Sequence, residues 1–153
     1  MKRPLAISII VLVVTVLSAA ASAQSTTDVA VNDTASTSCP SGEAVALTGV
    51  LHVAFASTTD AATGINNYQI AVLSEQSGTG QATQTNYAGE NASFGYNFPT
   101  TDSPAQISLQ LGSRLFSKGS APSLQLNQTL NITVDTAGHI SASTAGSTTQ
   151  CAN

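Results

Sequence analysis

The sequence predicts an all-β fold, a small antiparallel β-barrel or β-sandwich of about six to eight strands. Apolar and polar residues alternate with a period of two in several segments, which is typical of strands with one buried face. Turn-forming residues separate these segments at short intervals. Ser and Thr, with 20 residues each, make up about a quarter of the 153 residues, and no segment after the N-terminal region has an apolar pattern of helical period. The length allows one domain.

The N-terminal segment has the layout of a secretory signal peptide. A Lys2–Arg3 pair precedes an apolar run over residues 5–17, and small residues follow as far as Ala23. A basic start, an apolar run and small residues at a cleavage site characterise such signals, and Ala21 and Ala23 place cleavage after Ala23. An uncleaved membrane anchor is the alternative, although a membrane span usually needs ~20 apolar residues. Residues 1–23 are therefore predicted to be a signal peptide, and the protein is predicted to be secreted or periplasmic.

Charged residues are few, and most of them are acidic. Four basic and eight acidic residues give the chain a formal net charge of −4. Loss of the signal peptide would leave only Arg114 and Lys118 as basic residues. Such a chain lacks the basic excess that binds a phosphate backbone, and it repels anionic membranes. We therefore expect no nucleic-acid partner and no stable membrane insertion after cleavage.

Two cysteines delimit the predicted domain. Residues 24–38 are small and polar, so we expect them to form a flexible leader before a single β domain over residues 39–153. Cys39 and Cys151 are the only cysteines, and an even count in an exported protein favours a disulfide. Closing a loop of about a hundred residues or more stabilises a fold by roughly 4–5 kcal/mol in the chain-entropy model. Two free thiols or an intermolecular bridge are the alternatives.

The first strand is predicted over residues 45–55. Its odd-numbered residues are apolar apart from Gly49, and its even-numbered residues face the other way. Gly49 indicates a bulge or a close approach of another backbone. A turn over residues 60–64 leads into a return strand over residues 67–73.

The middle of the chain gives weaker signals. We expect residues 74–80 to form a Gly/Ser-rich turn and residues 81–87 to form a weak strand. Residues 92–98 place aromatic side chains at alternate positions, which predicts another strand. Pro99 is expected to end that strand because it has no backbone N–H to donate.

The last third alternates most clearly. The odd-numbered residues of 105–111 are apolar, and a loop follows over residues 118–122. Residues 124–134 predict a long half-buried strand with an uncharged polar outer face. Residues 135–138 predict a hairpin turn with Gly138 in the left-handed conformation, and residues 139–144 return as a strand.

Residues 39–52 read Cys-Pro-Ser-Gly-Glu-Ala-Val-Ala-Leu-Thr-Gly-Val-Leu-His. This segment resembles the pattern Cys-x-x-Gly-Glu-x-Val-x-Leu-x-Gly-x-x-His of a group of small secreted bacterial proteins. The ending is similar too, with a strand and turn over residues 131–138, a further strand and a late Cys151. The resemblance implies a secreted bacterial β protein; that group has no known activity to carry over. Where its members have further His residues after the first turn, this chain has Ile65-Asn66-Asn67.

A row of aromatic residues is the best ligand-binding candidate, because aromatics lining a groove or a barrel mouth can hold a sugar or an apolar molecule. Core packing is the alternative role for the same side chains. The candidates are Tyr68, Tyr87, Phe94, Tyr96 and Phe98.

Catalytic and metal chemistry have little support. His52 and His139 are the only histidines, whereas zinc sites need three or four protein ligands. Serine lies in no Gly-x-Ser-x-Gly elbow. A carboxylate pair for glycoside hydrolysis would have to come from few acids, chiefly the set Glu43, Glu75, Glu90 and Asp102. We therefore expect no catalytic residues, no metal, no cofactor and no enzymatic activity.

Two functions remain. The first is a structural or surface-interaction role for a non-enzymatic β domain, with an unknown protein or cell-surface partner; uncharged strand faces suit such contacts. The second is a carrier of a small apolar ligand. It requires that the apolar rows of residues 45–55 and 124–134 enclose a cavity.

Overall fold

The structure is a computed structural model that describes residues 23–40 and 42–152, with no side-chain description for Ala23. The described chain is all-β, as predicted. None of it forms a helix that could cross a membrane. Most of the predicted signal peptide, residues 1–22, lies outside the described residues. The strands are β1 (Ala23–Thr37), β2 (Val45–Thr59), β3 (Asn66–Gly80), β4 (Asn86–Gly89), β5 (Ala92–Thr100), β6 (Ala105–Ser117), β7 (Leu124–Val134) and β8 (Ile140–Cys151).

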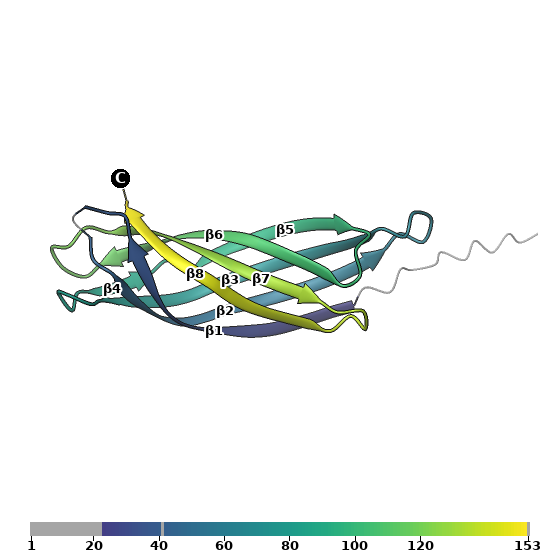
Figure 1. Cartoon of the computed structure of the whole chain (residues 1–153). Helices are drawn as coiled ribbons and strands as arrows, with labels where there is room; N and C mark the ends of the chain where they lie inside the picture. Colours follow the sequence, from purple (N-terminus) through teal and green to yellow (C-terminus); the bar gives the residue numbers. More distant parts are fainter. Residues whose placement is uncertain (1–22, 41, 153) are drawn as a thin grey trace, which may run out of the picture.

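Seven strands close into a barrel, and β5 is an additional strand on the edge of β3. The strand order is β2-β1-β8-β7-β6-β4-β3, and β3 pairs with β2 to complete the circle (Figure 1). The pairings are antiparallel except between β1 and β8, where Ser36 and Thr37 run parallel to Thr148 and Thr149. The barrel is therefore mixed, and this two-residue ladder is the only parallel one among the described pairings.

The barrel is tightly closed at only one end. There β1 pairs with β8 through two residues, and β4 pairs with β6 through Tyr87–Gly89. Among the described pairings, residues 23–35 of β1 have a ladder with β2 alone, and β5 has one with β3 alone. The other end thus consists of two facing sheets, β1-β2-β3-β5 and β6-β7-β8. The fold combines the two predicted architectures: a barrel at one end and a sandwich at the other.

A disulfide joins Cys39 and Cys151 at the closed end, as predicted, with 4.8 Å between the two Cα atoms. A bulge in β8 makes this pairing possible. The register between β7 and β8 shifts by one residue between Gln128 and Leu130, and Gly146 there has a φ of 106°. Before the bulge the even-numbered residues of β8 face inward, and after it the odd-numbered ones do. The bulge therefore turns Cys151 toward the interior.

The core fills the space between the strands with apolar side chains. The alternating residues predicted in 45–55, 105–111 and 124–134 are the buried ones. Six polar residues are buried, and all of them except Thr149 form what we call the interior polar layer: Ser74, Gln76, Ser113, Gln128 and Ser147.

Residues 24–38 do not form the predicted leader. Residues 23–37 form β1, which pairs with β2 over its whole length up to Ala35. Val29, Val31 and Ala35 are buried, so the strand has a true inner face. Few residues of β1 are apolar, and those few are small. The alternation of buried and exposed positions is therefore not recognisable in the sequence.

Three predictions in the middle of the chain are also wrong: the turn over residues 74–80, the strand over residues 81–87 and the strand end at Pro99. Residues 74–80 continue β3 instead of turning. Their inward positions hold Ser, Gln and Gly instead of large apolar residues, so the sequence does not show the alternation of a strand there. The turn follows at residues 81–85, and the short β4 comes after it. Pro99 does not end β5, in which it pairs with Asn67. An edge strand tolerates proline because one side of its backbone has no ladder partner.

Gly49 shows the predicted close approach. Its φ is 146°, and a Cβ atom at this position would lie 2.7 Å from the Cα of Gln76 and closer still to the carbonyl oxygen of Glu75. The register of β2 with β3 runs without interruption through Gly49, so no bulge is present here. The absence of a side chain allows β3 to pass this close.

Candidate functional site

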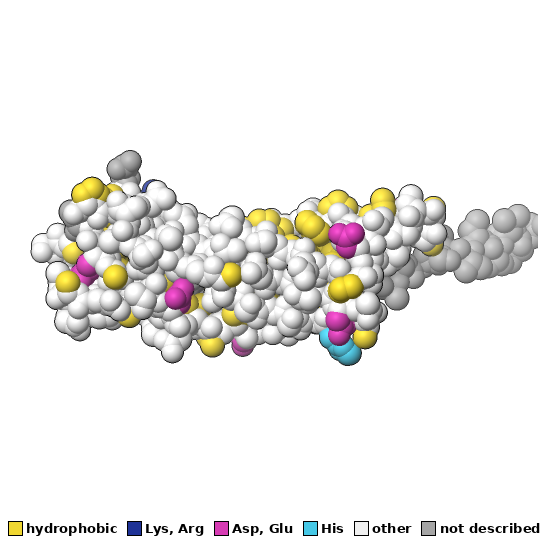
Figure 2. Space-filling view, viewed as in Figure 1, with side chains coloured by type: hydrophobic (Ala, Val, Ile, Leu, Met, Phe, Trp, Pro, Cys, Tyr) yellow, Lys and Arg dark blue, Asp and Glu magenta, His cyan; other side chains and the backbone are white. Residues whose placement is uncertain are grey.

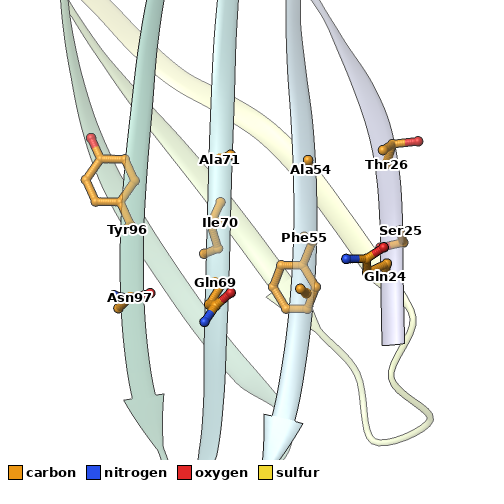
Figure 3. A pocket seen from close by; sticks show the side chains of 11 residues that line it. Gln24, Ser25, Thr26, Ala54, Phe55, Gln69, Ile70, Ala71, Tyr96 and Asn97 are labelled. Carbon is orange, nitrogen blue, oxygen red and sulfur yellow. The ribbon is translucent and has the colours of Figure 1, made fainter. Parts of the chain in front are cut away.

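A hollow of about 500 Å³ lies on the outer face of the sheet β1-β2-β3-β5 (Figure 3). A second hollow of about 400 Å³ adjoins it and shares Thr26, Ala54 and Ala71 with it. Phe55 and Ile70, which also line the first hollow, are buried and face the core. The two hollows together form one groove, here called the outer groove.

The floor of the outer groove is a single row of small residues across four strands. The strand registers align Thr26 with Ala54, Ala54 with Ala71, and Ala71 with Gly95. A Cβ atom added at Gly95 would meet nothing within 4 Å. Neighbouring strands lie about 4.8 Å apart, so the row is ~15 Å long and runs across the strands.

Each of the rows on either side of the floor includes larger side chains, and we call these rows the two walls. One wall is the aligned row Gln24, Ala56, Gln69 and Asn97. The other is the aligned row Asp28, His52, Leu73 and Ser93. With a rise of ~3.4 Å per residue, the two walls stand about 14 Å apart along the strands. The groove follows from register alone, since each row combines residues from four separate strands.

The two walls differ in chemistry. The first presents neutral amides, which can both donate and accept hydrogen bonds. In the second, His52 Nδ1 lies 2.7 Å from Asp28 Oδ1, and His52 Nε2 lies 3.7 Å from Glu75 Oε2. The hydrogen bond to Asp28 is the main reason that the pKa of His52 is raised above 6.5. Leu73 is 39% exposed beside this cluster and adds an apolar contact.

The predicted aromatic row does not form one surface. Tyr68 and Tyr87 are buried, and the ring of Tyr68 packs on Phe55 with 5.2 Å between centroids. Phe94, Tyr96 and Phe98 are half-buried against the core. The five predicted aromatic residues therefore do not share one role. Tyr96 and Phe94 line the two hollows of the outer groove, and Tyr68 lines a different hollow.

Tyr96 also closes the gap between β5 and β6. Its hydroxyl donates a hydrogen bond to the backbone carbonyl of Gln110 at 2.7 Å. No ladder joins these two strands in the described part of the chain, so a side chain supplies the link. Burial raises the pKa of Tyr96, which keeps the phenol protonated as a donor.

That different hollow, of about 320 Å³, lies at the open end of the barrel between the two sheets. Phe55, Tyr68, Val134 and Ile140 form its apolar part, and the β7–β8 turn forms its polar rim. Farther in, the apolar rows of residues 45–55 and 124–134 are buried in one continuous core. This mouth hollow is where the described structure comes nearest to the cavity that a carrier would need.

Three of the acidic residues serve turns. Glu43 accepts hydrogen bonds from the backbone N–H groups of Ala82 and Thr83, at 2.6 and 2.8 Å, and from the Thr83 hydroxyl. Asp60 and Asp135 accept backbone N–H groups in the same way at their own turns. These bonds lower the pKa of all three carboxyl groups; the Thr83 hydroxyl is the largest cause at Glu43, and the Ala62 N–H is the largest at Asp60.

The remaining candidates for chemistry are scattered. His139 Nδ1 lies 3.0 Å from Asp135 Oδ2 at the β7–β8 turn, away from the His52 cluster on the outer sheet. Within the described residues, no group of three or more His, Cys, Asp and Glu side chains could hold a metal ion. The outer groove has no local signal in the sequence, because its floor aligns single Thr, Ala, Ala and Gly residues from four separate strands. Comparisons with family models, with curated proteins and with solved structures give no match to this chain.

Proposed function

We propose that this chain is a non-enzymatic β domain, secreted or periplasmic, that works by surface interaction through the outer groove. The observation that carries the proposal is the cross-strand row of small residues between two walls that include larger side chains. A flat sheet face with alternating large side chains would offer no such channel. The groove gives a partner ~15 Å of contact across four rigid strands.

The chemistry of the groove favours an uncharged, extended partner segment from a protein or a cell surface. The amides of Gln24, Gln69 and Asn97 offer neutral hydrogen bonding on one side. Asp28 and Glu75 on the other side disfavour a phosphate or another anion. On the face that Figure 2 shows, the exposed side chains are mostly uncharged, with only a few acidic groups among them.

Two further features support an extracytoplasmic location. The Cys39–Cys151 disulfide is compatible with an oxidising compartment. The proposed cleavage after Ala23 would release a chain whose first residue, Gln24, already pairs with Ala56 in the β1–β2 ladder. Processing at that point would remove only the first residue of β1, Ala23, from the described strands.

The test is a cell-binding assay with the disulfide-bonded chain from Gln24, using cells of the organism that produces it. Ala71→Trp fills the floor of the groove and should abolish binding. Ser143→Trp places the same side chain on an exposed position of β8 in the opposite sheet, and it should bind like the unmodified protein. Binding that persists in Ala71→Trp contradicts the groove, and absence of binding by the unmodified protein contradicts the surface role.

The carrier function stays as a second candidate because of the mouth hollow. Phe55 and Tyr68 give this hollow an aromatic floor that an apolar molecule could contact. N-phenyl-1-naphthylamine is a suitable probe, since its fluorescence rises in an apolar site. Saturable binding that is lost in Ile140→Trp, which fills the mouth, would support a carrier. No saturable binding removes this candidate.

A further inference from the structure

The interior polar layer lies where the barrel changes from closed to open. Gln76 pairs with Gly49 across β2–β3, and Gln128 pairs with Ser147 across β7–β8 at the bulge. On one side of this level are the β1–β8 and β4–β6 pairings and the disulfide, and on the other side the two sheets separate. Gln76 is 8% exposed and Gln128 is 2% exposed.

The hydrogen bonds of the layer form a chain with a free end. Gln76 Nε2 donates both of its hydrogens, to Ser74 Oγ at 2.8 Å and to Gln128 Oε1 at 2.7 Å. Gln128 Nε2 then donates to Ser147 Oγ at 3.1 Å. Gln76 Oε1 is buried and accepts no hydrogen bond from any described group. A buried acceptor without a hydrogen bond lowers the stability of the fold, so we expect a donor beside Gln76 Oε1.

Reorienting the amides does not remove the free end. If both glutamine amides turned over, Gln128 would donate to Gln76, and the Ser74 and Ser147 hydroxyls would become donors. Gln76 Nε2 would then be the buried atom without a partner. One amide atom of Gln76 is thus left over in either arrangement, as an acceptor in one and as a donor in the other.

The residues that face Gln76 on the two neighbouring strands cannot provide a hydrogen-bond partner for its free amide atom. Gly49, which faces Gln76 on β2, has no side chain, and a Cβ there would be too close to the Gln76 backbone. On the β4 side, a Cβ at Gly89 would collide with the Gln76 carbonyl oxygen. Glycines therefore flank the β3 backbone at Gln76 on both neighbouring strands, and neither has a side chain that could bond to the free amide atom.

We propose that the interior polar layer is a binding site for a buried water molecule, held by the free amide atom of Gln76. Water both donates and accepts, so it satisfies this atom in either arrangement of the amides. A buried water typically makes about three hydrogen bonds. The layer provides further partners in its serine hydroxyls, including Ser113 from β6, which is 6% exposed. An apolar ligand that entered from the open mouth would meet these polar groups at the level of the layer.

The test is oxygen-17 magnetic relaxation dispersion of water on the disulfide-bonded chain from Gln24, which detects long-lived internal water. The unmodified protein should show a dispersion whose amplitude falls by about one water in the double variant Gln76→Leu/Gln128→Leu. Gln69→Leu, an exposed position on the same strand, is the matched control and should leave the amplitude unchanged. Equal amplitudes in all three proteins overturn the proposal.

A crystal structure of the unmodified protein keeps the test decisive if the double variant does not fold. An ordered solvent peak within about 3 Å of an amide atom of Gln76 supports the site. A Gln76 amide with no solvent peak beside it overturns it.

Discussion

Gln76 Nε2 donates a hydrogen bond to Gln128 Oε1 at 2.7 Å, which joins β3 to β7 through the interior of the barrel. These strands are not neighbours in the sheet, because β4 and β6 lie between them. The bond therefore joins one side of the barrel to the other at the level where the β1–β8 and β4–β6 pairings end. It specifies which residues of the two sheets face each other, which nonpolar contacts alone do less selectively.

This bond should be visible as coupling between the two glutamines. Gln76→Leu and Gln128→Leu each leave the other side chain buried without its partner, so each should lower the free energy of unfolding by about 1–3 kcal/mol. The double variant should lose less than the sum of the two, because both polar groups are gone. Urea unfolding of the four proteins measures this cycle. Additive losses would show that the two side chains do not depend on each other.

The disulfide should contribute much of the stability of the fold. It spans a sequence separation of 112 residues. Cys39→Ser/Cys151→Ser should therefore lower the free energy of unfolding by roughly 4–5 kcal/mol in the chain-entropy model. Guanidinium unfolding of the double variant against the oxidised protein checks the value, and the reduced parent chain serves as the control. An unchanged midpoint would contradict this role.

The bulge at Gly146 should decide whether the disulfide forms. Gly146→Val disfavours the φ of 106° that the bulge uses, and regular pairing with β7 that keeps every residue of β8 would turn Cys151 outward. We expect two free thiols, detected by mass spectrometry after alkylation under denaturing conditions. Gly95→Ala is the control. A Cβ atom at residue 95 would meet nothing within 4 Å, so the disulfide of this variant should be intact. A Gly146→Val variant that resists alkylation would contradict the prediction.

The bridge made by Tyr96 should hold the open end together. Tyr96→Phe keeps the ring but removes the donor to the Gln110 carbonyl, at an expected cost of about 0.5–1.5 kcal/mol. Amide hydrogen exchange should increase in β5 and in residues 105–112, with little change near the disulfide. Tyr68→Phe is a matched control at a buried tyrosine that makes no such bridge to β6. A uniform change over the whole barrel would argue against a local role.

The stability of the fold should fall at acidic pH because of three carboxyl groups in turns, and at alkaline pH because of His52. The pKa of Glu43, Asp60 and Asp135 is lowered by turn hydrogen bonds, so their contribution is present above the ordinary carboxyl pKa and is lost as the pH falls through the lowered value.

The pKa of His52 is raised, so its contribution is complete below 6.5 and is lost as the pH rises through the raised value. Asp28→Asn should remove most of the alkaline loss but not the acid loss. Urea midpoints at about pH 3, 6 and 9 separate the two effects. An alkaline loss of equal size in Asp28→Asn would contradict the assignment to His52.

Much of the fold could be read from alternation, because a buried face repeats every second residue wherever that face is built from large apolar side chains. Residues 45–55, 105–111 and 124–134 meet this condition, and their predicted inner faces are the buried ones. β1 and the second half of β3 do not meet it. Their inward positions hold small or polar residues, so residues 24–38 were mistaken for a leader and residues 74–80 for a turn.

By itself the sequence determined the all-β class, the main inner faces and the pairing of Cys39 with Cys151, since these depend on local periodicity and on a cysteine count of two. Only the tertiary structure decided the closure of the barrel, the bulge at Gly146, the polar layer and the outer groove. Each of these depends on which residues of different strands stand opposite one another. Register is a property of paired strands: Ala54 and Ala71 become one floor only when β2 and β3 align them.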